Sequence, residues 1–273
     1  MNTKEYLINE LHRYVKENGE IPRRNDIRYN KDYPSDNSYQ KEFGSFTKAL
    51  EISKLKLKIN DNFFNPNNIT LEGLYIVGLM IADGNIYNNV FSISLVDIET
   101  ICEMHKVLNL DTNIQLFHGV KTSAKIVKTN RQWIKDLSLY GIIPDKHLKT
   151  FLPLKYCKTE QEIAALCLGL FDGDGSIVIN KNKYASFEMA GSYDLCNQYS
   201  KILKNIGVTK EIKIEQKDCC IIRTARKKDI KIIYDFLYQN KSLSKLWISR
   251  KYNRWSKLLD KTFKSEDYYN EYR

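Results

Sequence analysis

Two aspartates, Asp83 and Asp174, each end an apolar segment in which small residues recur four positions apart. The small residues are Gly78 and Ala82 in the first segment and Gly169 and Gly173 in the second. Residues four apart share one face of a helix, and small residues let two helix backbones approach closely. We therefore expect the two segments to pack side by side as helices, which would bring Asp83 and Asp174 together at one end of the pair.

A pair of aspartates at that point has a defined chemical use. Like charges at close range raise the pKa of at least one carboxyl group unless cations lie between them. Carboxylate, water and phosphate oxygens are the ligands that Mg²⁺ prefers. Two metal sites can activate a water molecule and stabilise the leaving oxygen of a phosphodiester. The sequence therefore predicts Mg²⁺ as the cofactor and phosphodiester hydrolysis as the reaction, with Asp83 and Asp174 as catalytic and metal-binding residues.

The two segments resemble the paired motifs of the LAGLIDADG homing endonucleases, in the single-chain form that carries both copies. One apolar stretch that ends in Asp-Gly is common at helix ends, but two copies that open similar element patterns are hard to obtain by chance. Departures from the motif occur at Ile76, Val77, Ile81, Cys167 and Leu168. None of them removes the terminal acid of either copy.

The resemblance implies roles for further residues. The backbone carbonyls of Ala82 and Gly173, just before the aspartates, would help to hold the metals. Asp172 stands at the first aspartate of the motif and is expected to be a helix-end or packing residue. Each aspartate with its Mg²⁺ would serve one strand of double-stranded DNA at a long asymmetric site and leave short 3′ overhangs. The basic residues expected to stabilise charge on the phosphate are Lys146 and Lys251.

The resemblance also implies the fold, which is α+β. Two pseudo-symmetric αββαββα half-domains would form antiparallel DNA-binding saddles, and a small N-terminal helical module would be added to them. We expect the first half-domain over residues 69–155 and the second over residues 156–265. Because both halves lie on one chain, the pseudo-dimer is already complete and the protein is expected to be a monomer.

Alternating residues in the expected strands indicate where DNA would bind. Residues 210–217 alternate apolar with charged side chains, so one face of the sheet would pack on helices while the other stays polar. A curved antiparallel sheet with a polar face fits the major groove, although any one of these residues is equally explained as an ordinary solvated residue. The candidate DNA-binding residues are Asn85, Tyr87, Gln115, Lys125, Lys128, Ser176, Asn180, Lys181, Lys183, Lys213, Lys217, Arg223 and Arg226.

A separate helical module is expected over residues 1–55, followed by a Lys- and Asn-rich linker over residues 56–68. Apolar residues at helical spacing predict one helix that Gly19 ends and a second from Ser38 to Ile52. The module resembles the repeat associated with homing endonucleases, through Gly19, Ile21, Pro22, Ser38, Tyr39, Phe43, Gly44, Ser45 and Phe46. The resemblance implies that the module grips DNA, with Arg23, Arg24, Arg28, Lys41 and Lys48 as candidate phosphate contacts or else as a solvated face.

Composition agrees with a nucleic-acid partner. The 273 residues include 43 Lys and Arg against 33 Asp and Glu, a formal net charge of +10, which favours binding to phosphate backbones. The six cysteines lack C-x-x-C spacing and the four histidines lack zinc spacing. We expect reduced thiols, no structural zinc, no membrane partner and an intracellular location, in the cytoplasm or in an organelle or phage-infected compartment that holds the target DNA.

Three other functions stay open at this point. An intron maturase, which binds intron RNA and assists splicing, uses the same fold and can retain both aspartates. A DNA-binding regulator that does not cleave would typically have lost one acid, whereas this chain retains Asp83 and Asp174. A helical adaptor, in which the basic residues only solubilise the protein, would show no salt-dependent affinity for DNA.

Overall fold

The computed structural model of the chain describes residues 3–19, 21–55, 60–110, 112–144, 150–179, 185–209, 214–216 and 220–259. The chain divides into two compact units, which are treated separately below. The first comprises Met1–Asn60 and His105–Gln115, and the second comprises Asp61–Met104 and Leu116–Arg273. Over the described ranges, no helix combines the length and the apolar character that a membrane crossing requires.

Four short helices form the N-terminal module: α1 (Thr3–Asn18), α2 (Arg24–Arg28), α3 (Asp36–Phe43) and α4 (Phe46–Ile52). The expectation of one continuous helix from Ser38 to Ile52 is wrong. Gly44 adopts a left-handed conformation with φ of 81° and ends α3, and the Ser45 hydroxyl then caps α4 by accepting a hydrogen bond from the Lys48 N–H at 3.0 Å. The break lets Tyr39 and Phe46 pack edge to face with ring centroids 5.3 Å apart.

The basic residues of this module are partly used for its own stability. The Asp36 carboxylate is 3% exposed and accepts hydrogen bonds from Arg24 at 2.7 Å and from Arg28 at 2.9 Å. Burial raises the pKa of Asp36, but the two arginines outweigh burial and hold that pKa below its ordinary value. Arg24 and Arg28, expected as phosphate contacts, therefore also tie α2 to the start of α3.

From Leu71 onward the chain repeats one order of elements, helix, two strands, helix, two strands and helix. The first copy consists of α5 (Leu71–Ala82), β1 (Asn85–Tyr87), β2 (Val90–Leu95), α6 (Ile98–Val107), β3 (Gln115–His118), β4 (Thr122–Thr129) and α7 (Arg131–Leu139). The second consists of α8 (Glu160–Asp174), β5 (Gly175–Ile179), β6 (Ala185–Gly191), α9 (Tyr193–Asn205), β7 (Ile214–Gln216), β8 (Cys220–Thr224) and α10 (Lys227–Leu237), followed by α11 (Ser249–Leu259). A short 3-10 helix, Leu154–Tyr156, precedes α8. The α+β fold with two αββαββα copies is confirmed.

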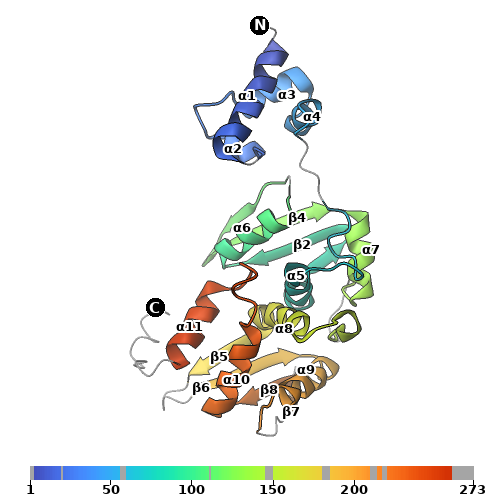
Figure 1. Cartoon of the computed structure of the whole chain (residues 1–273), viewed down its shortest axis with the longest axis vertical. Coiled ribbons are helices and arrows are strands. Elements are labelled where there is room, and N and C mark those ends of the chain that lie inside the picture. The colour runs from blue at the N-terminus through green and yellow to red at the C-terminus, as the bar shows by residue number, and fades with distance from the viewer. Residues whose placement is uncertain are drawn as a thin grey trace. The chain divides into compact units, whose positions relative to one another are not determined.

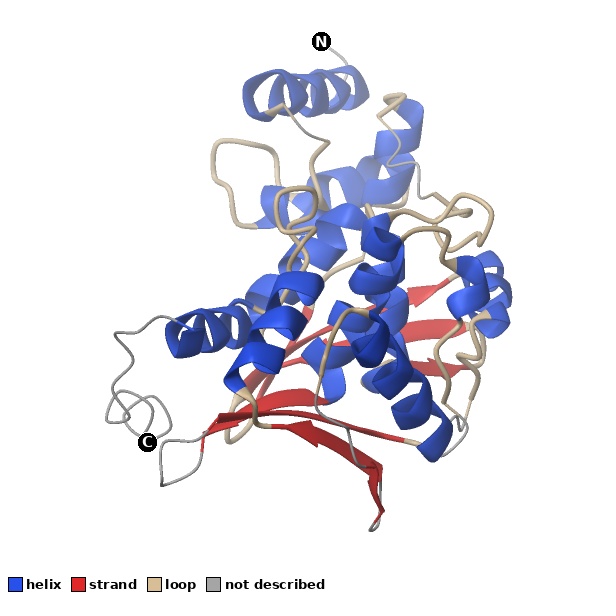
Figure 2. Ribbon diagram, turned by 60° about the horizontal axis from the view of Figure 1, so that its bottom comes forward, coloured by secondary structure: helices blue, strands red, loops and turns tan. Residues whose placement is uncertain are grey.

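Two four-stranded antiparallel sheets result, with strand orders β1-β2-β4-β3 and β5-β6-β8-β7. The turn between β1 and β2 has positive φ at Asn88 and Asn89, as tight hairpins require. The strands lie along one side of the layer of helices (Figure 2). Each sheet therefore has one face packed on helices and one open face.

Aromatic side chains fill the space between each sheet and its helices. In the first half, the rings of Phe64, Phe91 and Trp133 lie 5.3–6.0 Å from one another. In the second half, the ring centroid of Phe171 lies 5.6 Å from that of Phe187 and 5.0 Å from that of Trp255. Phe64 falls in the stretch expected to be a linker, yet it is fully buried, so the packing of the first half begins before α5.

The two motif helices, α5 and α8, lie side by side between the two sheets (Figure 1). Every residue from Gly73 to Ile81 of α5 and from Ala164 to Asp172 of α8 is buried, as expected for helices that are apolar on all sides. Thr70 caps the start of α5 and Thr159 the start of α8, each by accepting a backbone N–H in the first turn. The caps fix where each helix begins, and the apolar faces fix what it packs against.

Candidate active site and nucleic-acid interface

The contact between α5 and α8 is made by backbone atoms. A Cβ atom at Gly78 would overlap the Leu166 carbonyl oxygen and lie 2.8 Å from the Leu170 amide nitrogen. A Cβ atom at Gly169 would likewise overlap the Tyr75 carbonyl oxygen. Backbone atoms cannot move aside as the end of a flexible side chain can. Glycine at these positions is therefore the reason that the two helices can lie in direct contact.

That contact brings the ends of the two helices together. Asp83 follows α5 as its C-cap residue, Asp174 is the last residue of α8, and both are exposed. A Cβ atom at Gly173 would overlap the Ala82 Cβ atom and lie 3.3 Å from the Asp83 Oδ2 atom. The Asp83 carboxylate thus lies against the residue that directly precedes Asp174, as the spacing of small residues predicts.

The donor set at this point is small. Over the described ranges, no cluster of three or more His, Cys, Asp or Glu side chains could hold a metal ion. Two exposed carboxylates with neighbouring carbonyl groups suit a hard cation such as Mg²⁺, which commonly keeps several waters and takes further ligands from phosphate groups. The residues therefore fit a divalent ion that binds together with a phosphate-bearing substrate.

Asp172 is a buried packing residue, in line with its position in the motif. Its Oδ2 atom accepts hydrogen bonds from the Tyr75 hydroxyl and the Ile248 N–H, each at 2.8 Å, and its Oδ1 atom is buried without a hydrogen-bond partner. Burial raises the pKa of Asp172 to about 6, although the charge of Lys251 and these hydrogen bonds lower it. Asp172 thereby joins α8 to α5 and to the chain just before α11.

Lys251 caps the C-terminal end of α8. Its ammonium donates to the carbonyls of Phe171 at 2.8 Å, Asp172 at 2.7 Å and Gly175 at 2.7 Å, and lies 3.3 Å from the Gly173 carbonyl. Burial lowers the pKa of this ammonium to about 8, while the charge of Asp172 raises it. A cation at a helix C-terminus satisfies carbonyls that have no partner within the helix. The structure therefore places Lys251 on the backbone that carries Asp174.

Two further contacts hold the same C-terminal segment against the first half-domain. Arg250 forms a two-point ion pair with Asp97, with nitrogen to oxygen distances of 3.1 and 2.9 Å. The Thr100 hydroxyl donates to the Trp247 carbonyl oxygen at 3.2 Å. The residues from Trp247 to Lys251 thus contact both halves close to the end of α8. The sequence did not single out Arg250 or Asp97, because nothing local to either residue indicates the other.

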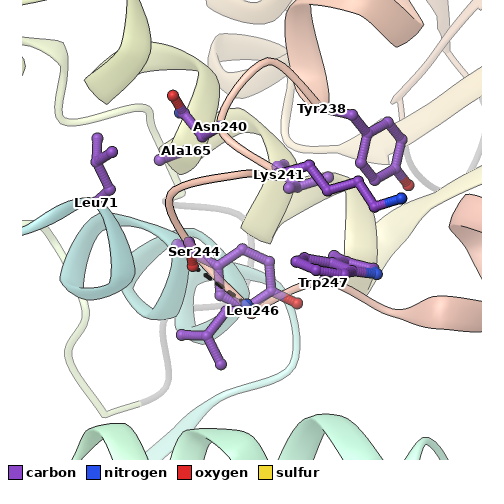
Figure 3. Close-up of a pocket in the computed structure, with 10 residues that line it drawn as sticks. Leu71, Ala165, Tyr238, Asn240, Lys241, Ser244, Leu246 and Trp247 are labelled. Carbon is purple, nitrogen blue, oxygen red and sulfur yellow. Dashed lines mark hydrogen bonds between the residues drawn. The ribbon is translucent and has the colours of Figure 1, made fainter.

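A small open pocket lies beside the N-terminal half of α5, where Leu71 and Tyr75 form part of its lining (Figure 3). Tyr75, Tyr238 and Trp247 contribute aromatic rings to its lining. The Lys241 ammonium lies over the ring of Tyr252 at 3.6 Å from its centroid and at 5.6 Å from that of Trp247. The pocket contains neither aspartate and is distinct from the candidate active site.

Only some of the predicted DNA-binding residues lie on the open faces of the sheets. Lys125 of β4, Ser176 of β5 and Arg223 of β8 alternate with buried residues and so lie on the open faces of the sheets. Lys128 pairs with Phe91 and shares its side of β4 with the buried Ile126. Asn85 and Tyr87 of β1 flank the buried Ile86 and lie on the open face as well, and Gln115 and Arg226 are exposed. Outside the described residues lie Lys146, Asn180, Lys181, Lys183, Lys213 and Lys217.

One residue of the open face was not predicted. Glu188 of β6 accepts hydrogen bonds from Arg223 Nε at 2.8 Å and from the Ser186 hydroxyl at 2.9 Å. An acidic residue is not expected on a surface that binds a polyanion. The only local signal was its alternation with the apolar Phe187 and Met189, and the strand register that pairs it with Arg223 is not visible in the sequence.

Comparison with known families confirms both resemblances. The homing endonuclease associated repeat matches residues 2–56, and the LAGLIDADG-like domain matches residues 161–238. No curated protein matches the sequence significantly.

Several solved structures are similar to the chain. The homing endonuclease I-WcaI bound to its DNA recognition sequence has 14% identity and a TM-score of 0.48, over 70% of this chain and 90% of that one. I-DmoI in complex with DNA and Mn has 17% identity and a TM-score of 0.42, over 62% and 98%. Full-length DUF199/WhiA from Thermatoga maritima has 16% identity and a TM-score of 0.45, over 79% and 70%.

Proposed function

We propose that this chain, which carries a homing endonuclease associated repeat and a LAGLIDADG-like domain, is a site-specific endonuclease that hydrolyses both strands of double-stranded DNA. The observation that carries the proposal is the meeting of the two motif-helix ends. The Asp83 carboxylate lies against Gly173, and the exposed Asp174 follows directly. Two acids at the junction of two related half-domains suit a substrate with two strands to cut.

Asp83 and Asp174 would hold Mg²⁺, with the Ala82 and Gly173 carbonyls as further ligands. Bound there, the metal would supply activation of a water and stabilisation of the leaving oxygen. The chain itself contributes the positions of these acids. The glycine contacts align α5 with α8, and Lys251 holds the last turn of α8 through its carbonyls. Lys146 stays a predicted charge-stabilising residue.

The open faces of the two sheets would orient the duplex. The strands lie on one side of the helical layer (Figure 2), and their polar side chains, which alternate with buried ones, would enter a major groove while basic residues contact phosphates. Two non-identical faces on one chain imply a monomer that recognises an asymmetric site. Each aspartate would serve one strand, and the cuts would leave short 3′ overhangs.

The test is cleavage of a DNA library that carries randomised sites, in the presence of Mg²⁺. We expect the intact protein to cut one family of related sequences. The variants Asp83→Asn and Asp174→Asn should lose cleavage or nick a single strand, and removal of the metal with a chelator should abolish cutting. Asp235→Asn is the matched control, since this exposed acid on α10 pairs with Lys231. Sequence-selective binding without any cleavage would instead support a regulator, and preferential binding of structured intron RNA would support a maturase.

A further inference from the structure

Three residues form a row across the open face of the second sheet. Ser176 of β5 pairs with Glu188 of β6, and Glu188 pairs with Arg223 of β8. The residues that flank Glu188, namely Phe187 and Met189, are fully buried on the opposite face. Ser176 lies two positions after Asp174, so this row, the charged row, is the part of the open face that adjoins the candidate active site along the chain.

The first sheet has an equivalent row without charge. Asn85, two positions after Asp83, pairs with Ser92 of β2, and Ser92 pairs with Val127 of β4. Glu188 and Arg223 therefore correspond to Ser92 and Val127 in the other half. The two half-domains share a fold but differ in chemistry at the same place next to each aspartate.

Glu188 fixes the direction of Arg223. The Arg223 Nε atom donates to Glu188 at 2.8 Å, and the Ser186 hydroxyl donates to the same carboxylate oxygen at 2.9 Å. The Glu188 side chain is 18% exposed, whereas that of Arg223 is 44% exposed. The acid thus lies beneath the arginine and neutralises part of its charge. A contact to phosphate would need only the charge, whereas an oriented planar guanidinium suits recognition of one planar partner.

We propose that Arg223, oriented by Glu188, reads a guanine near the cleavage position in the half-site bound by the second half-domain, and that the first half-domain has no such preference at the equivalent base pair. Guanine is the base that presents two acceptors, O6 and N7, to a guanidinium in the major groove. The inference rests on the proposed function, because it assumes that the open faces contact duplex DNA. Glu188 acts as a positioning residue, and Arg223 determines specificity.

The test separates base reading from cleavage. The full chain selects sequences by binding from a randomised DNA library in buffer with Ca²⁺ in place of Mg²⁺, and the bound sites are sequenced. We expect an off-centre guanine in the sites that the intact protein selects. Arg223→Met should lower discrimination at that one position by about 5- to 150-fold. Glu188→Gln should lower this discrimination less than Arg223→Met does, because glutamine keeps the shape of the side chain and loses only its charge. Glu188→Leu should lower it more than Glu188→Gln does.

Arg226→Met provides the matched control. Arg226 is an exposed arginine that precedes α10 and donates to Thr209, and its loss should weaken binding to all sequences alike and reduce the salt dependence. If Arg223→Met selects the same guanine as the intact protein, the inference is overturned while the endonuclease proposal stands. If the intact protein selects no sequence and cuts none, both are overturned. Retained far-UV circular dichroism confirms that each variant is folded.

Discussion

Under the proposed endonuclease function, replacing Lys251 by methionine should turn the protein toward a nicking enzyme. The methionine keeps an unbranched apolar side chain but removes the ammonium that binds three carbonyls of the α8 terminus at 2.7–2.8 Å. Asp174 lies on this stretch of backbone, whereas Asp83 lies at the end of α5. The loss therefore loosens one of the two acids more than the other.

The magnitude follows from these contacts. A hydrogen bond to a charged group contributes about 1.5–3 kcal/mol, and water can replace part of it because the Lys251 side chain is only half-buried. The favourable interaction with the helix C-terminus adds about 0.3–1 kcal/mol. We expect the free energy of unfolding to fall by about 2–4 kcal/mol. A misplacement of the catalytic acid by about 1 Å would slow its strand by about 100-fold.

The assay uses a supercoiled plasmid that carries the target site. Nicked circles should accumulate before linear product, and oligonucleotides labelled on one strand should show that the same strand is always cut first. Lys257→Met, on the exposed side of the same helix, should cut both strands as the intact protein does. The reasoning is refuted if Lys251→Met keeps its stability and slows both strands equally, since Lys251 would then act on the chemistry shared by both strands.

Three shorter predictions concern other parts of the molecule. Gly169→Ala should destabilise the protein by about 1–3 kcal/mol or more in urea unfolding, because its Cβ meets the backbone of α5, whereas Gly119→Ala, whose Cβ would lie at an ordinary 3.9 Å from the Lys121 carbonyl oxygen, should change little. Below about pH 4 the N-terminal module should lose stability, because the folded-state pKa of Asp36 is held low and its stabilising charge disappears as the pH falls through that value; hydrogen exchange of α1–α4 should show a larger loss in the intact chain than in Asp36→Asn, in which only Glu17, whose pKa the Tyr33 hydroxyl lowers, still contributes. Asp97→Asn removes the exposed ion pair with Arg250 and should lower stability by about 1 kcal/mol or less; a larger loss in thermal unfolding would contradict this.

The parts of the fold that depend on local pattern could be predicted from the sequence. The two motif helices are apolar on all sides and begin at threonine caps, so their extent follows from residues close together in the chain. The turn at Asn88 and Asn89 is likewise local. The break at Gly44 was missed because the apolar spacing continues across it, although Gly44 and Ser45 are residue types that commonly end and begin helices.

In the candidate site, too, the features that follow from local motifs could be predicted, and the contacts between distant segments could not. Asp83 and Asp174 were found because each ends a recognisable motif, and the small residues before them explain why the helix ends meet. The contacts of Lys251 and the pairing of Glu188 with Arg223 depend on packing and register between distant segments. The alternation of polar and apolar side chains excludes a shift by one residue, which would turn every strand side chain to the other face, but a shift by two residues preserves the alternation. The pattern within each strand therefore does not tell which residue of the next strand lies opposite.

The backbone contact between α5 and α8 also limits how such a protein can be recombined. A hybrid that joins this first half-domain to the second half of a related protein would have to place a glycine of each motif helix against a backbone carbonyl of the other, as Gly78 and Gly169 do here. Substitutions on the open faces of the sheets meet no such constraint. New target sequences should therefore be reached more readily by exchanging strand residues, or by grafting whole sheets onto an unchanged helix pair, than by shuffling complete halves.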